Sequence, residues 1–157
     1  MAVEAEVLNE LQRLRTRVPQ LSGALAASAD GLVLARDMPG VEAEALAALT
    51  AAALGVGRRM ADLAARGAFR ELLVRGAGGY VATYAAGPSA VLTLLADDRV
   101  NVGRLHLEGR RSGTRIAELM AAPATPDRPL GTPLPPPPPR PLGSLPLRIP
   151  PQSRYGS

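Results

Sequence analysis

A proline-free stretch at residues 41–67, VEAEALAALTAAALGVGRRMADLAARG, constrains the fold more than any other part of the chain. Apolar residues recur in it at steps of three and four, which places them on one face of a helix. These residues are Leu46, Leu49, Ala53, Val56, Met60 and Leu63. The flanks of this stripe are small and apolar too, with alanine at positions 43, 47, 48, 51 and 52. The pattern predicts a long helix that is apolar on more than one side.

The polar surface of this helix is smaller than a single domain requires. A helix on the surface of a small domain normally carries a polar back, and this stretch shows little polarity before Arg58. We therefore expect the helix to be covered on two sides, by its own sheet and by a second element. The leading candidate for that element is the same helix of a second copy of the chain.

Two glycines near the middle of the helix, Gly55 and Gly57, allow two interpretations. Each costs roughly 1 kcal/mol relative to alanine in a helix interior. They mark either a kink, or the junction of two shorter helices, or else a place where another backbone approaches closely. The many alanines nearby favour close approach.

The remaining elements follow from hydrophobic periodicity and turn signals. Residues 3–18 predict a helix that Pro19 ends, and residues 21–36 predict a hairpin around Asp30-Gly31. The predicted strands after the long helix, at residues 69–75, 80–86 and 89–96, precede a last helix at residues 102–120. The first of these strands has mixed charges that suit an edge position, and the last is apolar enough to be central.

The order αββαβββα predicts an α+β domain over residues 1–121, with a five-stranded antiparallel sheet and the long central helix packed on one face. The first and last helices are expected on the other face of the sheet, or together at one edge of it. This domain carries 14 arginines and 13 acidic residues, so its net charge is only +1.

Residues 122–157 differ sharply in composition, because they hold 13 of the 16 prolines. They predict a disordered proline-rich tail with a polyproline II segment. Pro135, Pro138 and Arg140 have the PxxPxR spacing that SH3-type grooves bind. The alternative, which we favour, is a solvated tail without a dedicated binding partner.

Composition also narrows the class of protein. Every cation is arginine, which is typical of a GC-rich genome and argues against a functional patch of arginines. A nucleic-acid partner is not expected either, because aromatic residues make up only 3% of the chain. The chain has no cysteine, its start is polar and acidic, and it contains no apolar run long enough to span a membrane. We expect a soluble cytoplasmic protein.

The sequence offers little chemistry for catalysis. His106 is the only histidine and is expected in a packing or surface role, Asp97-Asp98 are expected to cap the last helix, and residues 76–79 are expected to form a hairpin turn. We identify no catalytic residue, no cofactor site and no metal site. The chain is therefore expected to be a binding module and not an enzyme.

The order of elements, the SADGLVLA segment at residues 28–35 and the alanine-rich helix after it resemble the Roadblock family of the dynein light-chain type. The resemblance covers residues 4–120, and the bacterial members that accompany Ras-like GTPases are the most similar. It implies a homodimer in which the central helices pair antiparallel and the third strands join the two sheets. The implied interface residues are Ala48, Ala51, Ala52, Gly55, Arg59, Phe69, Glu71 and Leu73.

The resemblance also implies a function, that of a non-enzymatic regulator or scaffold of a Ras-like small GTPase, in some cases linked to a sensor kinase. A different class of function stays open beside it. In this alternative the sheet, similar in shape to profilin or PAS domains, holds a small molecule between sheet and helix.

Overall fold

The computed structural model describes residues 2–122, which form three helices and five strands. In chain order they are α1 (Ala2–Arg17), β1 (Leu21–Ser28), β2 (Val33–Asp37), α2 (Ala43–Leu63), β3 (Glu71–Gly76), β4 (Gly79–Ala86), β5 (Ala90–Asp97) and α3 (Val102–Ala121). The predicted order αββαβββα is confirmed. The predicted tail motif, Pro135, Pro138 and Arg140, lies outside the described residues.

The five strands form one antiparallel sheet in the order β2-β1-β5-β4-β3. The apolar strand β5 is central, between β1 and β4, and the mixed strand β3 is at one edge, as predicted. Strand β3 pairs only with β4 in the described part of the chain, so the hydrogen-bonding groups along its other side are available to a further strand.

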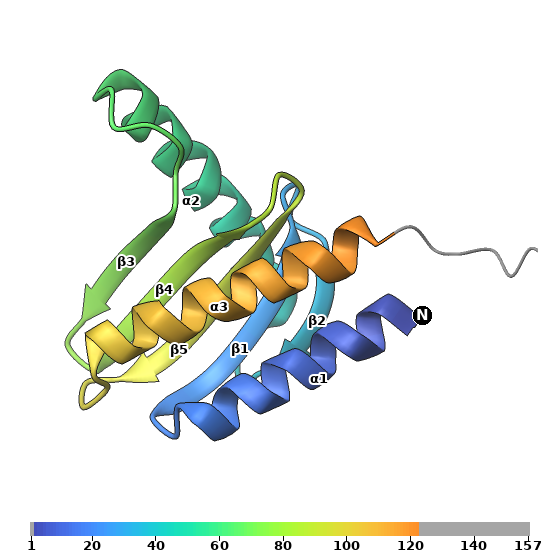
Figure 1. Cartoon of the computed structure of the whole chain (residues 1–157). Helices are drawn as coiled ribbons and strands as arrows, with labels where there is room; N and C mark the ends of the chain where they lie inside the picture. Colours follow the sequence, from blue (N-terminus) through green and yellow to red (C-terminus); the bar gives the residue numbers. More distant parts are fainter. Residues whose placement is uncertain (1, 123–157) are drawn as a thin grey trace, which may run out of the picture. The chain divides into compact units, whose positions relative to one another are not determined.

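The helices cover the two faces of the sheet unequally. Figure 1 shows α1 and α3 side by side on one face, with α2 on the other. The larger core, which includes Leu11, Leu92 and Ile116, lies beneath α1 and α3. A smaller core, which includes Leu25, Leu54 and Val91, lies beneath α2. The first of the two predicted arrangements of the terminal helices is therefore the observed one.

Helix α2 is continuous from Ala43 to Leu63, so the glycines do not divide it into two helices. Gly57 faces the same chain, because a Cβ atom there would lie 2.4 Å from Cε2 of Phe69. Gly55 is exposed, and a Cβ atom there would meet nothing within 4 Å. The close approach of the Phe69 ring thus explains why residue 57 is glycine. No contact within the chain explains Gly55, which a second molecule could still approach.

Two glycines of α3 have a similar explanation. A Cβ atom at Gly109 would lie 2.5 Å from Cε2 and Cζ of Tyr84, and one at Gly113 would lie 3.1 Å from the carbonyl oxygen of Ala85. The glycines that weaken α3 as an isolated helix therefore let it lie close against β4. The start of α3 is capped by Asn101, whose side chain accepts a hydrogen bond from the Arg104 amide. The prediction that Asp97-Asp98 cap this helix is therefore wrong.

Gly109→Ala is expected to destabilise the fold by about 1–2 kcal/mol, because overlap with a fully buried ring costs more than the gain in helix propensity. Tyr84 is 1% exposed, and its ring, not a flexible chain end, is what the new Cβ atom would meet. Urea unfolding measures the difference. In a Tyr84→Leu background the same substitution should cost much less, and an equal cost in both backgrounds would contradict the explanation.

Candidate interaction surface

The outward face of α2 is apolar. Its large exposed side chains are Leu49 (67% exposed), Val56 (59%), Met60 (60%) and Leu63 (73%). The buried positions of the helix are mostly small residues, namely Ala43, Ala47, Thr50, Leu54 and Gly57. The helix thus turns its small side chains to the sheet and most of its large apolar ones outward. We call the four exposed residues, together with their small neighbours on this face, the α2 outer face.

Most of the helical residues predicted for the dimer interface are exposed beside these large apolar side chains. Ala48, Ala52, Gly55 and Arg59 are exposed. They follow one another at steps of three and four along α2, beside the large apolar side chains. Ala51 is half-buried, and its Cβ would be 3.6 Å from a Cβ built at Gly31 in the β1–β2 turn.

The three predicted interface residues at β3 are directed mainly toward their own chain. Phe69 packs against Gly57 of α2. Glu71 pairs with Arg110 of α3, and Leu73 packs against the core beneath α1 and α3. Whether these side chains also reach a second copy stays a prediction.

Two residues of β3 that the sequence reasoning did not select lie on the face toward α2. Side chains alternate along a strand, so Leu72 and Val74 point to the opposite face from Glu71 and Leu73. Val74 is 53% exposed. The alternation of side chains along β3 is visible in the sequence, but the face of the sheet that α2 covers is not. The sequence therefore could not show which pair of residues, Leu72 and Val74 or Glu71 and Leu73, lies on the side of α2.

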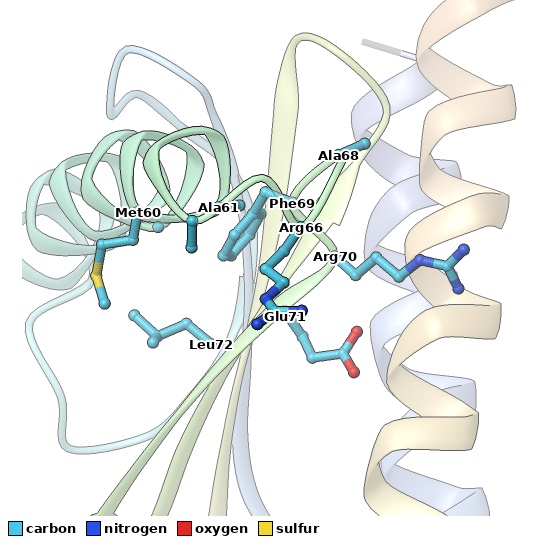
Figure 2. A pocket seen from close by; sticks show the side chains of 10 residues that line it. Met60, Ala61, Arg66, Ala68, Phe69, Arg70, Glu71 and Leu72 are labelled. Atoms are coloured by element: carbon cyan, nitrogen blue, oxygen red, sulfur yellow. The ribbon is translucent and has the colours of Figure 1, made fainter.

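A hollow of about 430 Å³ lies between the C-terminal half of α2 and the start of β3. Met60 and Ala61 line it from the helix, and Phe69 and Leu72 line it from the chain that leads into β3. Figure 2 shows the side chains of Met60 and Leu72 pointing toward one another across the hollow. The hollow therefore continues the α2 outer face toward the sheet edge.

On the other face of the sheet, Glu71 accepts two hydrogen bonds from Arg110, the one from Nε measuring 3.1 Å. These bonds lower the pKa of Glu71, against the opposing effect of its partial burial. Nearby, the Tyr84 hydroxyl lies 2.9 Å from Nδ1 of His106, and burial raises the pKa of Tyr84. His106 thus packs against Tyr84, which is one of the two roles, packing or surface, that the sequence predicted.

The pair of Glu71 and Arg110 makes stability depend on acid pH. A carboxyl whose pKa is lower in the folded chain than its ordinary 4.5 stabilises the fold above that value, and the stabilisation is lost as the pH falls through the folded pKa. Glu71→Gln should therefore be less stable than wild type at neutral pH, with the difference vanishing in acid. Urea unfolding at a series of pH values and one protomer concentration measures this. Parallel stability curves would contradict it.

A second polar cluster joins α1 to α3. Arg17 donates from Nε to Oε2 of Glu108 at 2.7 Å, and from one terminal nitrogen to Oε1 of Glu10 at 2.9 Å and to Oγ of Ser112 at 2.8 Å. Ser112 donates in turn to Glu10 at 2.6 Å. Burial lowers the pKa of Arg17, but the bonds and charges of the two glutamates outweigh it and raise the pKa.

Among residues 2–122, no group of three or more histidine, cysteine or acidic side chains is placed to hold a metal ion. No helix in the same range is long and apolar enough to cross a membrane. The surface that most indicates a binding partner is the exposed, apolar α2 outer face beside the unpaired edge of β3.

Comparison with known proteins identifies relatives of this domain. Residues 7–96 match the family model of the Roadblock/LC7 domain. An uncharacterized protein of Methanocaldococcus jannaschii is 31% identical over 97 residues, which cover 61% of this chain and 84% of the relative.

Solved structures share the fold at lower sequence identity. One described as MglB with tetrameric arrangement superimposes with a TM-score of 0.70 at 22% identity, covering 76% of this chain and 90% of that chain. A Roadblock/LC7 domain from Streptomyces avermitilis gives a TM-score of 0.66 at 23% identity, covering 72% of this chain and 96% of that chain.

Proposed function

The chain belongs to the Roadblock/LC7 family, and we propose that it is a non-enzymatic homodimer that regulates or scaffolds a Ras-like small GTPase. The observation that carries the proposal is the α2 outer face, where Leu49, Val56, Met60 and Leu63 are each more than half exposed. Contiguous exposed apolar residues of this kind mark interaction sites. The family resemblance implies what binds to the α2 outer face, namely the same face of a second copy of the chain.

The edge strand supports the same assembly. If two β3 strands pair antiparallel about Leu73, Glu71 of one copy faces Arg75 of the other, and Leu72 faces Val74. The first pair is opposite in charge and the second is apolar, and both kinds of cross-strand pair are favourable. The pairing would also satisfy the open hydrogen-bonding groups of β3, whose exposure is otherwise a liability.

The GTPase partner comes from the family resemblance. Members that accompany Ras-like GTPases regulate or scaffold them, and the MglB structure that shares this fold is described as a tetrameric arrangement. We infer that this chain likewise works by assembly, with a dimer that presents two equivalent surfaces to the GTPase. No residue of the chain needs a catalytic role in this scheme.

Capture experiments test the proposal. The full chain, immobilised, is incubated with a purified Ras-like GTPase of the same organism, loaded either with GDP or with a non-hydrolysable GTP analogue. We expect retention that depends on the nucleotide, or a changed rate of GTP hydrolysis when the chain is added in solution. Retention that is equal for both nucleotides or absent, with an unchanged hydrolysis rate, would rule out the proposal.

A small-molecule sensor is the second candidate, because the hollow beside Phe69 has the volume of a small ligand site. Native mass spectrometry of the purified chain distinguishes the two. A co-purifying ligand that is lost in a Met60→Trp variant, which fills the hollow, would favour the sensor. Protein-only masses together with nucleotide-dependent capture would favour the regulator.

A further inference from the structure

The face formed by α1 and α3 carries a groove of about 470 Å³ that the proposed dimer does not use. Helices α1 and α3 lie on the side of the sheet opposite α2 (Figure 1). Pairing through the α2 outer face would therefore leave this groove uncovered. Arg13 and Arg17 line it from α1, and Arg111 and Arg115 line it from α3. We call it the arginine groove.

These four arginines differ in the hydrogen bonds and ion pairs that their side chains already make. Arg17 is committed to Glu10, Glu108 and Ser112, and Arg115 makes an exposed pair with Glu118 at 3.2 Å. The side chains of Arg13 and Arg111 are exposed and form neither a hydrogen bond nor an ion pair with any residue that the structure describes. One guanidinium group on each helix is therefore available to an anionic partner.

The acidic residues of the same groove restrict the kind of anion. Glu10 and Glu118 also line it, and their carboxylates would repel a compact group with several negative charges. Single carboxylates spaced along a peptide can each reach one guanidinium group and form the paired hydrogen bonds that arginine favours. Leu107 is 64% exposed one helical turn before Arg111, so it offers an apolar contact beside the charges.

We propose that the arginine groove binds an acidic segment of a partner protein through separate side-chain carboxylates. Arg13 and Arg111 are the anchors, and Leu107 contacts an apolar residue of the segment. The inference goes beyond the proposed function, because it requires neither the dimer nor a GTPase. In a dimer, two such grooves would lie on the outside of the assembly, which would let one dimer hold two acidic segments.

The test uses a fluorescein-labelled peptide of alternating glutamate and alanine, titrated with the full chain at low salt and followed by fluorescence anisotropy. We expect saturable binding that weakens as salt is added. The double variant Arg13→Glu and Arg111→Glu should lower the affinity by ~10-fold or more, since two charge-assisted contacts are lost. The control, Arg36→Glu with Arg99→Glu, changes net charge equally away from the groove and should bind as wild type does.

Three outcomes would overturn the proposal. They are the absence of saturable binding, an equal loss of affinity in the control, and tighter binding of a peptide with phosphoserine in place of glutamate. Circular dichroism melting confirms that each variant is folded before it is titrated. A chain made monomeric by changes on the α2 outer face should still bind the glutamate peptide, so failure of the dimer and failure of the groove can be told apart.

Discussion

A chain that carries Leu49→Asp together with Val56→Asp is expected to be monomeric at concentrations where we expect the wild-type chain to be a dimer. Both side chains are more than half exposed in the single chain, so the changes leave the fold intact. In the dimer each buried aliphatic side chain contributes ~1.5–3 kcal/mol, and two desolvated carboxylates add a further penalty. The dissociation constant should rise by at least ~100-fold. Sedimentation velocity over a dilution series measures it.

The matched control uses two exposed leucines elsewhere, Leu32 in the β1–β2 turn (65% exposed) and Leu107 on α3 (64% exposed). Leu32→Asp with Leu107→Asp changes composition and charge in the same manner and should leave the dimer unchanged. Ala52→Glu on the α2 outer face should act like the double variant. A Leu49→Asp, Val56→Asp chain that stays dimeric, or a control that dissociates equally, would contradict the assignment.

Arg17→Met is expected to be the most destabilising single change in the cluster between α1 and α3. Glu10 and Glu108 are 7% and 9% exposed, and without Arg17 both nearly buried carboxylates would lose the ion pair that the structure shows. Removing one partner of a buried ion pair costs about 3–5 kcal/mol, because the remaining charge has lost its compensation. Urea unfolding at fixed protomer concentration measures the loss.

The rescue variant separates charge from packing. Glu10→Gln with Glu108→Gln in the Arg17→Met background removes both charges and keeps the shapes, so it should recover most of the stability. If Arg17→Met costs less than ~1 kcal/mol, the network is only a surface ion pair. If the glutamines recover nothing, the loss comes from packing of the arginine stem.

The fold was predictable because its signals are local. Hydrophobic period, Asp30-Gly31 and Pro19 give the order and type of the elements, and the apolar run of β5 gives its central place. Which face of a helix packs against the sheet was not predictable in the same way. The apolar stripe of α2 predicted one face of a helix, but the sheet takes the face of small residues because these let helix and sheet approach closely.

The same limit explains the glycines and the polar clusters. Gly57 and Gly109 look like defects in a helix until Phe69 and Tyr84, distant in sequence, are placed against them. Arg17 and Glu108 are separated by 91 positions, so no spacing rule joins them. The helical positions of the predicted interface, such as Ala52 and Gly55, came from the family resemblance, and the structure shows them exposed. The orientation of β3, which turns Leu72 and Val74 toward α2, depends on the assembled sheet.

Disulfide trapping tests the central claim, dimerisation through the α2 outer face, most directly. The chain has no cysteine, so Ala52→Cys introduces a single thiol near the middle of α2. In an antiparallel pair of helices related by a two-fold axis, residues near the crossing point face their own copies. We expect mild oxidation to convert the 16.3 kDa chain of this variant into a cross-linked dimer of twice that mass, and to leave a Thr114→Cys control on α3 monomeric in a denaturing gel. An Ala52→Cys chain that stays uncross-linked, or cross-links no faster than the Thr114→Cys control, would contradict the claim.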